Sequence, residues 1–188
     1  MSTLTMEQRR TDFEAMLKRA NRVRAAGQER WEMFPEADGL MLARLTEEVS
    51  NLCRGWHEAA HRASLGKLAP YTVGQVKKHA LQVAAHSLAA LRDRTTESYL
   101  APIREMGHQL DDRDLGMDPA ERIGWLLSTL GDLGTCYHRN LDPNGSITVF
   151  RLRSLTVEAL CAALAADRGL WQEDASHDSS CRGAWCVT

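Results

Sequence analysis

The sequence is poor in the residues that interrupt helices or build sheets. Only 5 of its 188 residues are proline and 6% are aromatic. Valine and isoleucine are also scarce, and no segment alternates apolar and polar residues at the period of two that a half-buried strand requires. Alanine and leucine are abundant instead. The composition therefore predicts an all-α protein.

Long apolar runs and targeting signals are absent as well. The longest apolar stretches, 81–91 and 155–166, are interrupted or too short for a membrane span of roughly 20 residues. The N-terminus lacks the basic-then-apolar pattern of a secretory signal. The 5 cysteines form no CxxC pair, so we expect reduced thiols. We expect a cytoplasmic protein that does not contact a membrane.

The charge balance excludes another class of partner. Lys and Arg number 23 and Asp and Glu 25, which gives a formal net charge of −2. A protein that binds duplex nucleic acid usually carries a basic excess, and no basic cluster here is longer than a few residues. Neither a P-loop nor a GxGxxG motif is present. Duplex nucleic acid is therefore not an expected partner.

Amphipathic patterns predict a bundle of about six helices. Two starts carry clear capping signals: Thr5 with Gln8 three residues on, and the run Asp118-Pro119-Ala120-Glu121. The other starts are expected after Gly39, near Thr72, at Pro102 and near Thr148. The predicted apolar stripes include Val23, Leu45, Leu52, Val83, Leu88, Leu127 and Leu133.

Internal similarity suggests a duplication. Residues 41–52 align with 122–133, and residues 78–90 align with 154–166 in the same order. Upstream, Val23-Arg24 and Gly27 align with Ile103-Arg104 and Gly107. We expect two degenerate three-helix repeats, 1–95 and 96–170, followed by a flexible tail at 171–188, all in one compact unit.

Three segments of the first repeat resemble one family. LTEEVSNL (45–52) and HALQVAAHSLAAL (79–91) are similar to the two motif helices of the MazG-like nucleotide pyrophosphohydrolases of phages and bacteria. The segment AAGQERWEMFPEADG (25–39) resembles the entry to those helices. The family pattern is EExxE followed by ExxD on the next helix. The resemblance implies an all-α enzyme that uses Mg²⁺ to split a nucleoside triphosphate into the monophosphate and pyrophosphate.

The motif is only partly present in the first repeat. The two leading acids map to Glu47 and Glu48, and the third position is Asn51. The ExxD positions hold His79 and Gln82. The resemblance implies that Glu47 and Glu48 are the catalytic residues and hold the metal, whereas Asn51, His79 and Gln82 contact the nucleotide.

The second repeat keeps two acids at the matching positions, Asp132 and Glu158. There are two alternatives. Either these acids and the Glu47–Glu48 pair form one composite Mg²⁺ site, in which Mn²⁺ can substitute, or the fold persists and the hydrolytic activity has been lost. The first case predicts a nucleoside triphosphate pyrophosphohydrolase, our leading interpretation. The second predicts an inactive relative that binds a nucleotide or a protein partner. Three acids within bridging reach favour the enzyme, and two or fewer favour the binding protein. A tandem repeat is compatible with a monomer that imitates a dimer, or with a homodimer.

Other side chains leave alternatives open. His57-Glu58-Ala59-Ala60-His61 matches HExxH, in which two histidines bind Zn²⁺ and the glutamate is the general base of a metalloprotease, although so short a match often occurs by chance. The histidines His57, His61, His79 and His86 form a transition-metal site, contact phosphate, or are ordinary exposed or hydrogen-bonded side chains.

Arg24 and Arg104 recur at matching repeat positions, where they contact phosphate or lie on the surface. Trp31 and Trp56 either stack on a base or fill the core.

Overall fold

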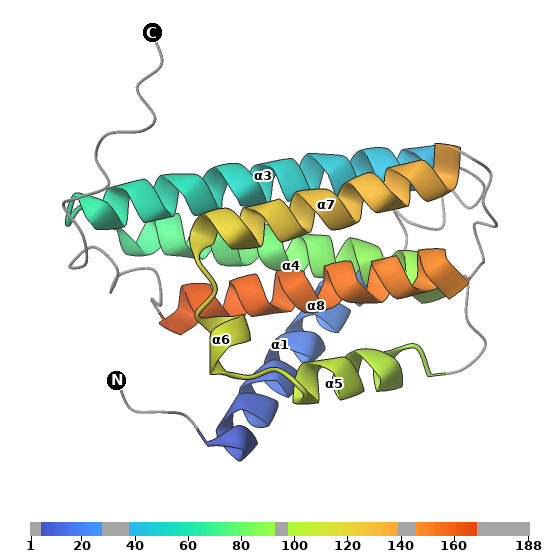
Figure 1. The fold of residues 1–188 in the computed structure, drawn as a ribbon, viewed down its shortest axis with the longest axis horizontal. Coiled ribbons are helices and arrows are strands. Elements are labelled where there is room, and N and C mark those ends of the chain that lie inside the picture. Colours follow the sequence, from blue (N-terminus) through green and yellow to red (C-terminus); the bar gives the residue numbers. More distant parts are fainter. Residues whose placement is uncertain (1–4, 28–37, 93–97, 139–145, 169–188) are drawn as a thin grey trace, which may run out of the picture.

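The computed structural model describes residues 5–27, 38–92, 98–138 and 146–168, and every regular element in these ranges is a helix (Figure 1). The helices are α1 (Met6–Ala26), α3 (Asp38–Ser64), α4 (Pro70–Arg92), α5 (Leu100–His108), the single turn α6 (Asp112–Leu115), α7 (Pro119–His138) and α8 (Ser146–Arg168). The all-α prediction is confirmed. Among the described residues, no helix is both long and apolar enough to cross a bilayer.

The helices form three layers. In Figure 1, α3 and α7 lie above α4 and α8, and α1 and α5 lie below them. Each half of the chain supplies its helices in the same order, first to the lower layer, then to the upper, then to the middle. The expected boundary between residues 95 and 96, and the expected tail, lie outside the described residues.

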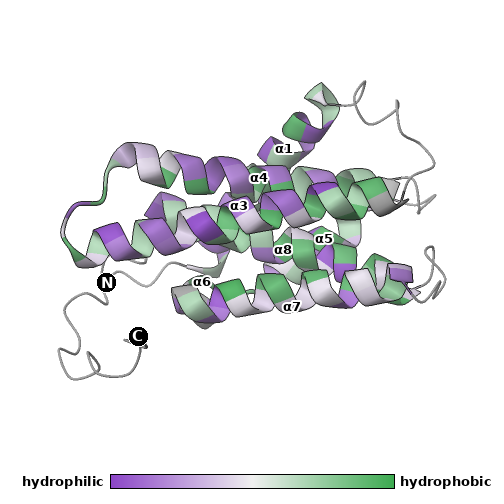
Figure 2. Ribbon diagram, turned by 90° about the horizontal axis from the view of Figure 1, so that it is seen from above, coloured by the Kyte–Doolittle hydropathy of each residue, from purple (hydrophilic) through white to green (hydrophobic). Residues whose placement is uncertain are grey.

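The core is centred on α4 and α8, which pack against each other. Every residue from Ala159 to Ala166 of α8 is buried, so this stretch faces protein on all sides. Its many alanines let neighbouring helices approach closely. Seen from above, α3 in the upper layer carries strongly polar residues along its length, whereas α7 is mostly pale or apolar (Figure 2). The α3 side of the bundle is therefore the more polar part of the upper layer.

Both predicted caps are confirmed. The Thr5 hydroxyl accepts a hydrogen bond from the Gln8 backbone N–H at 3.2 Å. The Asp118 carboxylate accepts bonds from the N–H groups of Ala120 at 2.8 Å and Glu121 at 3.3 Å. These bonds satisfy donors that have no partner within the first turn of a helix.

Helix α4 begins at Pro70, close to the predicted start near Thr72, because proline is well tolerated at the first helical position. Two details of the predicted helices were wrong. Val23 is 40% exposed, since the buried stripe of α1 ends at Ala20. Leu127 is 47% exposed because Leu126, about 100° away around the helix, takes the buried position.

Candidate functional site

Two of the predicted site residues meet where α3 and α4 pack together. His79 on α4 donates a hydrogen bond from Nδ1 to the Glu48 carboxylate on α3, over 3.1 Å. Both side chains are mostly enclosed, with 15% of Glu48 and 20% of His79 exposed. Leu45 and Val49 on α3 and Ala80 on α4 are fully buried beside them in the sequence. The apolar stripes thus position the pair at the seam between the helices.

Two further polar residues of α4 continue this row. Gln82 is one turn beyond His79, and its side-chain oxygen is buried and accepts no hydrogen bond from a described residue. One turn later, His86 donates from Nδ1 to the Gln82 backbone carbonyl at 2.7 Å. Burial lowers the pKa of His86, although the charges of Glu48 and Glu47 oppose this shift. We call Glu48, His79, Gln82 and His86 the α3–α4 seam site.

The other predicted residues of α3 lie outside this pair. Glu47 is 59% exposed and forms an ion pair with Arg44 at 3.5 Å. The Asn51 side-chain oxygen accepts a hydrogen bond from Arg54 at 3.4 Å. Glu47 is nevertheless close enough to act electrostatically on His86, as Arg44 does. The second carboxylate is therefore near the seam but turned toward solvent.

Each of the two predicted acids of the second half is paired with an arginine of that half. Asp132 on α7 contacts Arg151 on α8 at 2.9 Å, and both side chains are partly exposed. Glu158 on α8 lies 3.3 Å from Arg122 on α7. Burial raises the pKa of Glu158, and the nearby Arg122 charge partly offsets that rise. These pairs satisfy the two carboxylates away from the seam site.

The side chains near the seam can be compared with the ligands that the implied Mg²⁺ requires. Within the described ranges, no three His, Cys, Asp or Glu side chains are grouped so that they could hold a metal ion. Mg²⁺ prefers six oxygen ligands, and in nucleotide sites one or two carboxylates combine with phosphate oxygens and water. Glu48 and Glu47 could supply the one or two carboxylates of that smaller role, and a nucleotide would have to supply further oxygen ligands. They do not form a protein cage for the ion alone.

The HExxH segment has a structural explanation. His57 and His61 are both exposed on α3. The intervening Glu58 forms an ion pair with Arg62 at 2.7 Å, one turn further along the helix. This pair engages the carboxylate that a metalloprotease would use as its general base.

The two arginines at matching repeat positions, Arg24 and Arg104, also have partners within the protein. Arg24 bonds to the Asn21 side chain at 2.8 Å and lies over the Tyr99 ring. Arg104 pairs with Glu14. Trp56 is 2% exposed and belongs to the core. Trp31 lies outside the described residues.

Sequence reasoning missed the role of Arg122. Its side chain is 1% exposed, bonds to Glu158 and to the Asp114 carbonyl, and lies 5.8 Å from the Trp56 ring centroid. Such a buried arginine has no local sequence signal, because its partners come from three other segments of the chain.

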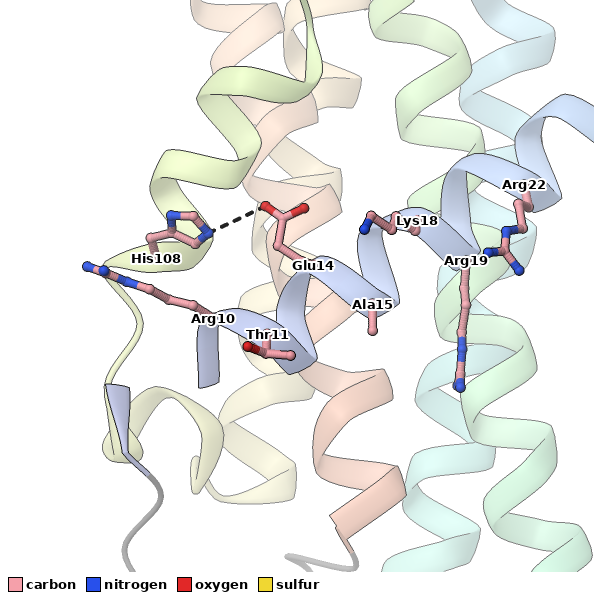
Figure 3. A pocket seen from close by; sticks show the side chains of 8 residues that line it. All are labelled: Arg10, Thr11, Glu14, Ala15, Lys18, Arg19, Arg22 and His108. Atoms are coloured by element: carbon pink, nitrogen blue, oxygen red, sulfur yellow. Dashed lines mark ion pairs between the residues drawn. The ribbon is translucent and has the colours of Figure 1, made fainter. Parts of the chain in front are cut away.

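A hollow of about 610 Å³ beside α1 was also missed. Its lining contains four cationic side chains, namely Arg10, Lys18, Arg19 and Arg22 (Figure 3). The signal that could have found it is the four-residue spacing of Arg10, Glu14, Lys18 and Arg22, which places them along one side of a helix. Comparisons with protein-family models, with curated proteins and with solved structures gave no match to this chain.

Proposed function

We propose that the protein binds a nucleoside triphosphate together with Mg²⁺ at the α3–α4 seam site, as a MazG-like protein. The supporting observation is the contact between Glu48 and His79, which are 31 residues apart in the sequence. The resemblance maps Glu48 to a position of the EExxE motif and His79 to a position of the ExxD motif.

Electrostatics explains why the metal accompanies the nucleotide. The carboxylates of Glu47 and Glu48 repel a bare triphosphate, and a Mg²⁺ ion held by these carboxylates would offset that repulsion. When bound, the ion would neutralise phosphate charge. Binding is therefore expected to require both the divalent ion and the two carboxylates.

The carboxylate arrangement favours binding without hydrolysis. Of the four predicted acids, Glu47 and Glu48 are near the seam, whereas Asp132 and Glu158 pair with Arg151 and Arg122. This is the smaller acid set that predicts an inactive relative. The proposed function is accordingly nucleotide binding.

Pyrophosphohydrolase activity is the second candidate, and one observation favours it. A carboxylate that accepts a hydrogen bond from Nδ1 orients an imidazole so that its Nε2 can take a proton. In such a reaction His79 would remove a proton from water as the water oxygen attacks the α-phosphorus. The bond to pyrophosphate would break, leaving the nucleoside monophosphate.

The test is a panel of NTPs and dNTPs with and without Mg²⁺ or Mn²⁺, measured for binding by calorimetry and for pyrophosphate release. We expect binding that needs the metal and weakens about tenfold or more in Glu47→Ala/Glu48→Ala. Glu58→Ala is the matched control, since it removes an exposed, arginine-paired glutamate from the same helix.

Each result has a definite meaning. Metal-dependent binding without release establishes the binding protein, and release that is lost in His79→Asn establishes the enzyme. The absence of binding to every nucleotide, with either metal, would refute the proposal. If Glu58→Ala weakened binding as much as Glu47→Ala/Glu48→Ala, the nucleotide would not be bound at the seam site.

A further inference from the structure

The second candidate site is on the other side of the molecule. The hollow of about 610 Å³ follows α1 and reaches His108 in α5 (Figure 3). A smaller hollow of about 380 Å³ adjoins it and shares Arg10 and His108. In Figure 1, α1 and α5 lie below the α4 and α8 layer, whereas α3 lies above it.

Unpaired positive charge is concentrated in the larger hollow. Arg10, Lys18 and Arg22 are exposed along α1, and none forms an ion pair with a described residue. Arg19 contributes a fourth cation, shared with Asp167 at 3.9 Å. Three cations are therefore available to a ligand without first breaking a contact within the described protein.

The single acid in that lining is already neutralised. Glu14 pairs with Arg104 of α5 and lies 3.4 Å from Nε2 of His108, as the dashed line in Figure 3 marks. Its carboxylate links α1 to α5 and is 23% exposed. Because Glu14 is engaged in this way, the field within the hollow is dominated by the cations.

The lining also defines the chemistry of the ligand. It contains no Phe, Tyr or Trp on which a base could stack, and apart from His108 its members without a formal charge are Thr11 and Ala15. The volume lies within the range of about 300–1,000 Å³ that is usual for small-molecule sites. Three cations at helical spacing suit an anion with several phosphate groups better than one with a single charge.

We propose that the hollow between α1 and α5 binds a small polyphosphate, either inorganic or as the phosphate tail of a nucleotide. The proposal is independent of the seam site, because it needs neither Glu48 nor a divalent metal. Arg10 is its central contact, since it lines both hollows.

The test titrates the full chain with inorganic tripolyphosphate in a chelating buffer, with calorimetry as the readout. Arg10→Gln/Lys18→Gln should weaken binding about tenfold or more, because each change removes a charge-assisted contact. Lys67→Gln/Lys78→Gln is the matched control, since it removes two exposed cations elsewhere and should leave the dissociation constant within about twofold. Circular dichroism checks that both variants are folded.

Competition experiments identify the source of the phosphate. Competition by ATP without metal assigns the site to a nucleotide tail, and binding of tripolyphosphate alone assigns it to inorganic polyphosphate. The proposal is overturned by the absence of tripolyphosphate binding, or by equal weakening in the control. Tighter binding of a single-stranded oligonucleotide that displaces tripolyphosphate would also overturn it, because the hollow would then belong to a nucleic-acid surface.

Discussion

The ring of Phe13 in α1 lies directly against the backbone of Gly107 in α5. A Cβ atom added at position 107 would overlap with three ring carbons of Phe13, whose side chain is only 1% exposed. The two helices approach this closely because residue 107 has no side chain. This contact holds together the two walls of the proposed polyphosphate site.

Gly107→Ala should destabilise the protein. The added methyl group must displace a buried aromatic ring, and such overpacking typically costs about 1–3 kcal/mol. Urea unfolding followed by circular dichroism measures the change. Gly124→Ala on α7 is the control, because its new Cβ would meet no atom within 4 Å. That variant should gain roughly 0.5–1 kcal/mol from helix propensity. Equal stabilities of the two variants would contradict the close approach.

Arg122→Met should be among the most destabilising single substitutions. It removes the partner of Glu158 and leaves a carboxylate in a mostly buried position, which typically costs about 3–5 kcal/mol. Arg151→Met removes the exposed partner of Asp132 and should cost less than about 1 kcal/mol. Denaturant unfolding of both variants measures the difference.

A double variant separates the ion pair from packing. Arg122→Met/Glu158→Leu removes both charges, so it should recover much of the stability lost by Arg122→Met alone. A double variant no more stable than Arg122→Met would show that the Trp56 and Asp114 contacts of Arg122 dominate instead.

His86 should make stability depend on pH. Burial lowers its pKa below 6.5 in the folded state, so the unfolded chain takes up a proton first as the pH falls. The contribution is fully present above pH 6.5 and is lost as the pH falls toward the folded pKa. Relative to His86→Gln, the wild type should lose up to about 1.4 kcal/mol per pH unit in that window. Unfolding curves between pH 7 and pH 5 measure this difference, and parallel profiles for the two proteins would contradict it.

The thiols of Cys53, which is partly buried, and Cys161, which is in the core, should resist alkylation in the native protein. Burial raises the pKa of Cys53 to about 11 and that of Cys161 to about 12, so little thiolate exists at pH 8. Iodoacetamide should modify both residues slowly until denaturant is added. Peptide mass spectrometry reads each site separately. Rapid native labelling of Cys161, which is 1% exposed, would mean that α8 opens readily.

The parts of this fold that depend on neighbouring residues could be predicted from the sequence. The caps at Thr5 and Asp118 need only the next three residues, and both are present. The apolar period also placed Leu45 and Val83 in the core correctly. The predicted burial of Leu127 was wrong, because the apolar period identifies the buried face of a helix but not how much of that face the neighbouring helices cover.

The sites were harder to predict because their residues come from separate helices. The resemblance suggested that Glu48 and His79 belong to one site, and the packing of α3 on α4 brings them into contact. The burial of Arg122 depends on three distant segments, so no local pattern reveals it. The cations of the α1 hollow are spread at helical intervals, so a search for consecutive basic residues overlooks them.

The enclosed position of α8 also determines when the core of the protein can form during synthesis. Helix α8 follows in the chain every helix that it packs against, including its main partner α4. On the ribosome, α4 can pack against α1 and α3 as it emerges, but its side that faces α8 stays uncovered until residue 168 has been synthesised. During that interval the nascent chain exposes apolar residues of α4 that are buried in the complete fold. Completion of the core should thus depend on when α8 becomes available rather than on the formation of the individual helices.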